Sequence, residues 1–196
     1  MQDNEMIQRI RQGDKALFGQ LADRYYDDVF RYCYYQTGNE QAAWDCTQDT
    51  FFHLLRFLDS YTEQGKFKAW LLRIALNACR DYFRKNRPNN YSYEELSEQH
   101  REAASIPESA ASPARASESS LYHSSPENRV ETALLIQEGL NRLPETQRET
   151  VVLYFYYGYK QREIARITGA PLSTVKTRLR TGIQSLQKYY ENLQLL

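Results

Sequence analysis

Basic residues at helical spacing are the first feature of the sequence that could do chemistry. Residues 65–87, GKFKAWLLRIALNACRDYFRKNR, carry seven Lys or Arg against one Asp, in a chain whose formal net charge is zero. Positions three, four and seven apart share one face of a helix. Arg73, Asn77, Arg80 and Arg84 are therefore predicted to form one polar stripe that could bind a polyanion. The alternative is a basic face that is merely solvated.

A second basic block, residues 159–186, has the form of a helix-turn-helix. Ala165 is small where two helices would cross, Gly169 stands where the turn needs a positive φ, and Val175 is apolar where the second helix would pack on the first. Hydroxyl and Arg side chains on the second helix suit the major groove of DNA, although a structural helix pair is the alternative. The candidate contacts are Ser173, Thr174, Lys176, Thr177, Arg178, Arg180 and Thr181.

A third stripe is acidic and carries one large aromatic residue. Asp45, Gln48, Asp49 and Phe52 share one face of a helix predicted over about 40–58. An exposed aromatic residue among charges is a common anchor for a protein partner. The stripe is interpreted as a partner-binding face, and a solvated acidic face is the alternative.

The loop over residues 59–66, DSYTEQGK, leads the chain into the basic helix. Tyr61 is the candidate for stacking on an unpaired base, and Lys66 extends the basic face toward the loop. Trp70 lies beside two leucines at the start of an amphipathic helix, so it is predicted to pack in the core.

Catalytic chemistry finds no support in the remaining residues. The three Cys are isolated in sequence and lie among apolar helical positions, which predicts buried free thiols. The three His are scattered, and no hydrolytic triad, phosphate loop or carboxylate pair can be assembled. We expect no enzyme activity, no metal, no cofactor and no small-molecule substrate.

The elements that position these residues are predicted to be helices in two small domains, which makes the fold class all-α. Residues 1–87 form the first domain and residues 127–196 the second, with a flexible, acidic, Ser- and Pro-rich linker over 88–126. Asp14 is predicted to cap a long helix that runs through Gln36. A helix over 127–142 is predicted to turn Val130, Leu134, Leu135 and Leu140 inward.

Composition agrees with a soluble protein, and its charge alternates along the chain. Hydrophobic residues make up 41% and charged residues 26%, without an apolar run long enough to span a bilayer. The start has no secretory pattern, so a cytoplasmic location is expected. Residues 66–87 carry a net charge of plus six, and residues 159–190 carry seven bases against one Glu, which predicts two separate places for a polyanion.

Three motifs together resemble the bacterial RNA polymerase sigma factors of the extracytoplasmic-function (ECF) group of the sigma-70 family. The stretch AAWDCTQDTF over 42–51 is similar to the family's acidic DxxQ(D/E)xF motif, and residues 67–85 are similar to FxxWLxxIAxNxxxDxxR. Residues 140–179 are similar to LPxxxRxV followed by EIAxxxG and TVKxRL. Departures are Trp44, Cys46 and Ser173, which affect details of contacts.

The resemblance implies a transcription initiation factor that binds core RNA polymerase and directs it to promoters. The acidic stripe would bind the coiled coil of the largest polymerase subunit, the 59–66 loop and the basic helix would capture the −10 element, and the second domain would read the −35 element and touch the polymerase flap. An anti-sigma factor is a further expected partner. The rival interpretations are a free-standing helix-turn-helix transcriptional regulator and a nucleic-acid-processing enzyme.

Overall fold

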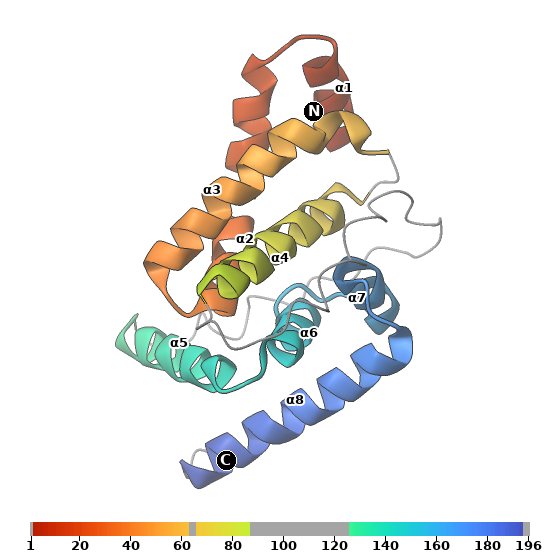
Figure 1. Ribbon diagram of the computed structural model, residues 1–196. Coiled ribbons are helices and arrows are strands. Elements are labelled where there is room, and N and C mark those ends of the chain that lie inside the picture. The colour runs from red at the N-terminus through yellow and green to blue at the C-terminus, as the bar shows by residue number, and fades with distance from the viewer. Residues whose placement is uncertain (1, 63–65, 87–125, 194–196) are drawn as a thin grey trace.

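Helices make up all the regular structure in the described residues of the computed structural model, which are 2–62, 66–86 and 126–193. Figure 1 shows the helices in chain order. The all-α prediction is confirmed. The predicted linker over 88–126 lies outside the described residues except for Pro126, where a helix begins, so its character and the domain boundaries stay predictions. The helices are α1 (Asp3–Arg11), α2 (Ala16–Thr37), α3 (Glu40–Phe57), the 3-10 turn η1 (Leu58–Ser60), α4 (Phe67–Asn86), α5 (Pro126–Asn141), α6 (Glu145–Phe155), α7 (Gln161–Thr168) and α8 (Leu172–Asn192).

Helices α1–α4, here called the N-terminal helices, pack around a core that α2, α3 and α4 share. Leu21, Leu54 and Leu72 are completely or almost completely buried in it, one from each of these helices. Gly38 ends α2 with a φ of 65°, and the Asn39 side chain then caps α3 by accepting from the backbone N–H of Ala42 at 2.9 Å. These two residues turn the chain sharply, so that α3 runs back along α2.

Helices α5–α8, here called the C-terminal helices, form a second group in which α6, α7 and α8 all contact one another. Val152, Ile164 and Val175 are fully buried, one from each of these helices. Gly169 ends α7 with a φ of 72°, as the helix-turn-helix pattern predicted. Figure 1 shows α8 along the bottom of the molecule, on the opposite side from α1.

The two groups of helices also contact each other, because α2 packs on α5 and α6 while α4 packs on α7. Helix α6 therefore lies between the N-terminal helices and α8, as Figure 1 shows. Buried side chains from both groups form one continuous hydrophobic cluster. This contact between the groups was not predicted from the sequence.

Two local predictions were wrong. Asp14 does not cap α2, whose N-cap position is Lys15; the Asp14 carboxylate instead accepts from Arg9 at 2.7 Å, an ion pair that holds it away from the helix N-terminus. Leu134 is 61% exposed, whereas Leu140 is buried. Helix α5 contacts α2 and α8, with Ile136 packed against the hydrophobic cluster and Leu135 half-buried, so Leu134 is left on the outer side. The side chain of Val130 lies outside the described residues.

Candidate nucleic-acid interface and partner surface

The basic stripe of α4 lies on the side of the helix away from the N-terminal core. Leu71, Ala75 and Ala78 are buried on the core side, while Asn77 on the stripe is exposed. Arg73 and Lys66 are half-buried. Arg84 is exposed and forms an ion pair with Asp81, one helical turn earlier, at 2.7 Å. An exposed pair of this kind contributes little to stability, so Arg84 can exchange its partner for a phosphate.

Arg80 differs from the rest of the stripe, because its guanidinium group is bound within the chain. Its Nε and Nη2 atoms donate to the two carboxylate oxygens of Glu149 on α6, both at 2.8 Å, and Nη2 also donates to the Thr168 carbonyl on α7 at 3.3 Å. Burial lowers the pKa of the Arg80 guanidinium, but the hydrogen bonds and charge of Glu149 outweigh it and raise the pKa overall. In this structure the Nε–Nη2 edge of the Arg80 guanidinium is therefore occupied by Glu149 and the Thr168 carbonyl.

Tyr61 is only 5% exposed, so it is not free to stack on a base in this structure. Its ring packs against Phe67 and Trp70, with centroid distances of 5.4 and 5.0 Å. Trp70 is half-buried and packs on the hydrophobic core, as predicted. The reason for the difference at Tyr61 is that the chain turns back at η1, which brings residue 61 under the first turn of α4. Residues 63–65 of the predicted loop lie outside the described residues.

Arg11 holds the start of this loop, a role that was not predicted from the sequence. Its Nη2 atom donates to the carbonyl oxygens of Leu58 at 2.7 Å and Asp59 at 3.2 Å, and also to that of Tyr61. These carbonyls lie just beyond the end of α3, where backbone acceptors lack helical partners. No local sequence pattern indicates these hydrogen bonds, because Arg11 and the loop are far apart in the chain.

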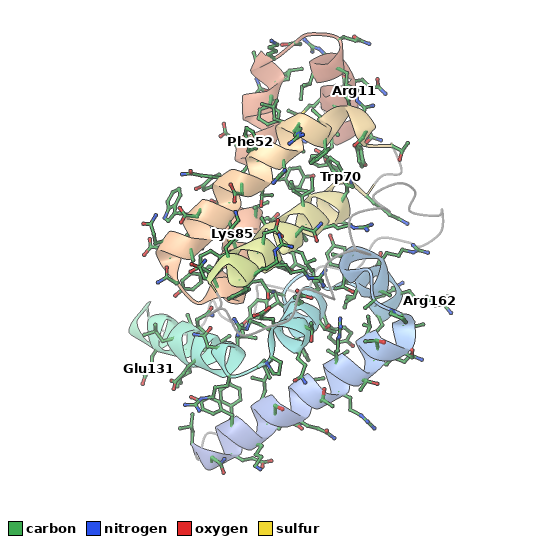
Figure 2. The ribbon with its side chains drawn as sticks, viewed as in Figure 1. Arg11, Phe52, Trp70, Lys85, Glu131 and Arg162 are labelled. Atoms are coloured by element: carbon green, nitrogen blue, oxygen red, sulfur yellow. The ribbon has the colours of Figure 1, made fainter. Side chains whose placement is uncertain are left out.

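The acidic stripe of α3 is exposed along its whole length. Asp45, Gln48 and Asp49 are exposed, and Phe52 has an exposed fraction of 65%. Figure 2 shows Phe52 on α3, on the side of the molecule away from α8. The predicted residues thus lie together on one open helix face, which can take an apolar partner that also carries positive charge.

Three further apolar side chains of α3 are exposed, which was not predicted from the sequence. They are Trp44 (41%), Leu55 (57%) and Phe57 (44%). Leu55 follows Phe52 by three positions and extends the same face. Exposed apolar side chains that share one face of a surface helix, as Phe52 and Leu55 do, are typical of protein contact sites. In the sequence, apolar residues occur on several sides of this helix. That pattern does not distinguish a helix buried inside a bundle from a helix that leaves some apolar side chains exposed.

The helix-turn-helix presents polar side chains along one side of α8. Val175, Leu179 and Gly182 are buried against the rest of the C-terminal helices. All seven predicted DNA contacts on α8 are exposed or half-buried. The hydroxyl groups of Thr177 and Thr181 donate to the carbonyls of Ser173 at 3.1 Å and Thr177 at 2.9 Å, which leaves the lone pairs of each hydroxyl oxygen available as acceptors.

The cysteines do not form part of either surface. Cys33, Cys46 and Cys79 are buried free thiols, as predicted. Hydrogen bonds to the Cys33 and Cys46 thiols, together with burial, raise the pKa of the Cys79 thiol well above its usual range. The Cys79 thiol therefore stays protonated. Among the described residues no group of three or more His, Cys, Asp or Glu side chains is arranged to hold a metal ion.

Comparison with known proteins supports the interpretation of both halves. Residues 21–88 match the family model for Sigma-70 region 2, and residues 133–186 match that for Sigma-70, region 4. The α3 and α4 surfaces fall in the first match, and α7 with most of α8 falls in the second. In the described part of the chain no helix has the length and apolarity needed to cross a membrane.

Similar proteins of the same kind match nearly the whole chain. The ECF RNA polymerase sigma factor BldN of Streptomyces coelicolor is 31% identical over 94% of this chain, which spans 64% of the length of BldN. The ECF RNA polymerase sigma factor SigW of Bacillus subtilis is 28% identical over 98% of this chain and 99% of SigW. A solved structure of the sigma factor RpoE with the anti-sigma factor NepR, from Bartonella quintana, is similar in fold, with a TM-score of 0.62 at 23% identity over 89% of this chain and 96% of that chain.

Proposed function

Because the chain belongs to the extracytoplasmic-function group of the sigma-70 family, we propose that it is the promoter-specificity subunit of a bacterial RNA polymerase. It binds core polymerase and directs it to promoters through the −10 and −35 elements. The observation that carries this function is the presence, in one chain, of an open acidic and aromatic face on α3 and a separate helix-turn-helix with an open polar face on α8. A partner protein and a duplex can therefore be bound at different places.

Each surface has its own role in the proposal. The α3 face with Asp45, Gln48, Asp49 and Phe52 binds the coiled coil of the largest polymerase subunit, and the C-terminal helices touch the flap. The α4 stripe and the loop before it capture the −10 element, and α8 reads the −35 element from the major groove. Residues 1–87 and 127–196 act as the two binding domains, with 88–126 as the linker between them.

The proposed mechanism involves no bond chemistry in this chain. Promoter opening is driven by binding an unstacked base and the single strand more tightly than the duplex. The polymerase supplies catalysis, so this chain acts as a binding subunit in the cytoplasm, where the polymerase works. An anti-sigma factor is a proposed regulator, because RpoE from Bartonella quintana has been solved with one. The exposed apolar side chains of α3 are the proposed site for it.

Charge reversal on α3 tests the polymerase contact. The variant with Asp45→Lys and Asp49→Lys is expected to be retained on immobilised core polymerase about tenfold less than the parent, because both carboxylates lie in the centre of the proposed contact. The double variant with Asp23→Lys and Asp27→Lys, both exposed on α2, is the control with the same change of net charge and should be retained normally. Full retention of the double variant would remove α3 as the polymerase surface.

Transcription from fragmented genomic DNA with core polymerase separates the three functions. With this protein added, RNA 5′ ends should gather at discrete sites that share two sequence elements upstream. A free-standing regulator would protect duplex DNA tightly without polymerase and create no new start sites. A nucleic-acid-processing enzyme would change the DNA itself in the absence of polymerase. RNA ends that are the same with and without the protein would rule out the proposed function.

A further inference from the structure

The contact between the two groups of helices covers part of the basic stripe. Arg80 on α4 donates to both oxygens of Glu149 on α6 and to the Thr168 carbonyl at the end of α7. The Glu149 side chain is only 5% exposed and that of Arg80 is 26% exposed. A ligand cannot reach the guanidinium group of Arg80 along its bonded edge while α6 and α7 stay in place.

A second set of bonds joins the two groups at the start of α4. The Tyr157 hydroxyl donates to the Asp28 carbonyl at 2.6 Å, and Lys68 forms an ion pair with the Asp28 carboxylate, also at 2.6 Å. The Lys68 ammonium group lies 5.5 Å from the centre of the Tyr157 ring. Lys68 is thus held between a carboxylate of α2 and an aromatic ring that follows α6.

The third set of contacts lies at the far end of α2. Arg148 on α6 donates to the Gln36 carbonyl, and its guanidinium carbon lies 5.9 Å from the centre of the Phe83 ring. The Tyr35 and Tyr156 rings are 4.2 Å apart. Charged, hydroxyl and tyrosine groups therefore supply much of the contact between the two groups. Separating the two groups returns these polar side chains to water but also exposes the hydrophobic cluster that both groups share, so the closed form is favoured and its polar bonds contribute to that preference.

We propose that this chain inhibits itself, because Glu149 occupies the position at Arg80 that a DNA phosphate takes when the two groups of helices separate. The proposal rests on the function given above, in which the α4 stripe contacts the −10 element. A carboxylate and a phosphate both bind guanidinium through two parallel hydrogen bonds, so each can replace the other at this site. Glu149 is thus an internal competitor for the promoter.

The closed form also reduces the apparent affinity of the stripe. A ligand that needs the open form binds more weakly in proportion to the fraction of open molecules. Removing the Glu149 charge should therefore open the chain and strengthen binding of single-stranded DNA. Removal of a negative charge at a position away from Arg80 should raise the affinity for single-stranded DNA only through the change in the net charge of the chain.

Distance measurement by pulsed electron spin resonance tests the opening. Spin labels are attached at Asp23→Cys on α2 and Ser185→Cys on α8, which are both exposed, while the native cysteines are buried and stay unlabelled. Glu149→Gln should shift the distances to longer and broader values. Glu138→Gln is the control, since Glu138 is exposed and pairs with Arg142 within the C-terminal helices. A second opening variant, Tyr157→Phe, removes the bond to Asp28, and Tyr154→Phe, on an exposed ring, is its control.

Fluorescence anisotropy with single-stranded DNA of mixed sequence tests the competition. The Glu149→Gln chain should bind about tenfold more tightly than the Glu138→Gln chain, as expected for the loss of one charge-assisted pair. Unchanged distances in both opening variants would overturn the proposal, as would an equal shift in their controls. If the distances lengthened but the affinity for single-stranded DNA did not rise, the proposed competition between Glu149 and a DNA phosphate would be wrong. Failure of the proposed function is distinguishable, because it would show as no promoter-specific transcription by the parent.

Discussion

Gly169 and Gly19 show how differently two glycines act at the residue scale. Gly169 has a φ of 72°, and a Cβ added there would meet nothing within 4 Å. Gly19 is exposed at the end of the first turn of α2, and a Cβ there would also meet nothing within 4 Å. Space is therefore available at both positions, and the backbone conformation alone decides the effect of adding a side chain.

We expect Gly169→Ala to lower the free energy of unfolding by about 1–2 kcal/mol, because an L-residue is strained in the left-handed region. Gly19→Ala should raise it by about 0.5–1 kcal/mol, because alanine loses less backbone entropy in a helix. Urea unfolding followed by circular dichroism measures both changes. Shifts of the same sign in the two variants would contradict the explanation.

Features that depend on neighbouring residues could be predicted from the sequence. The positive φ of Gly169, the end of α2 at Gly38 and the buried state of the cysteines follow from local spacing and residue type. The pairing of Arg80 with Glu149 could not be predicted, because the two residues are 69 positions apart and the chain between them includes the predicted linker. Helical spacing gives the face on which Arg80 lies but not what covers that face.

At the element scale, α8 offers a direct test of duplex recognition. Arg180 is exposed among the predicted contacts, and Lys188 is exposed nearer the C-terminal end of the same helix. A helix that enters the major groove contacts bases through its N-terminal part. Both cations are thus exposed on the same helix, but Arg180 is expected to lie closer to the DNA than Lys188.

Arg180→Ala is expected to weaken binding to duplex −35 DNA by about tenfold or more, as for the loss of one good base or phosphate contact. If Arg180 contacts a phosphate, the slope of log affinity against log salt should also fall by about 0.9. Lys188→Ala should leave both quantities near the parent values. Gel-shift titrations across a salt series provide the measurement, and equal losses in the two variants would show that α8 contributes only general charge.

Helix α3 shows the limit of periodicity at this scale. The stripe from Asp45 to Phe52 was predicted from spacing and is exposed, but the exposure of Trp44, Leu55 and Phe57 was not predicted. Apolar residues on several sides of a helix indicate several contacts, and only the fold shows which of these side chains stay exposed. The candidate site was therefore larger than the sequence indicated.

At the scale of the whole molecule, the chain is neutral because its charged blocks alternate in sign. In the closed structure, two cations of α4 pair with carboxylates of other helices: Lys68 pairs with Asp28 on α2, and Arg80 pairs with Glu149 on α6. The excess charge of the basic helix is thus partly neutralised within the protein. Under the proposal of self-inhibition, Arg80 has two roles, since it holds the closed form and would contact DNA in the open form.

A double-mutant cycle separates these two roles through promoter opening by the holoenzyme. Asn77→Ala and Arg80→Ala should each reduce opening, because both side chains belong to the stripe, although only Asn77 is exposed in the closed form. Glu149→Gln should increase opening in the parent but have no effect in the Arg80→Ala background. The interaction energy between Arg80 and Glu149 should be about 1 kcal/mol or more, since the two groups act as one unit.

Permanganate footprinting at a fixed, limiting holoenzyme concentration measures the opened fraction in all four combinations of the cycle. Asn77→Ala combined with Glu149→Gln is the matched control, because these side chains share no contact and their effects should add. If Glu149→Gln increased opening equally with and without Arg80, the carboxylate would act through general charge. If opening were the same in Asn77→Ala, Arg80→Ala and the parent, the α4 stripe would not be the face that captures the melted strand.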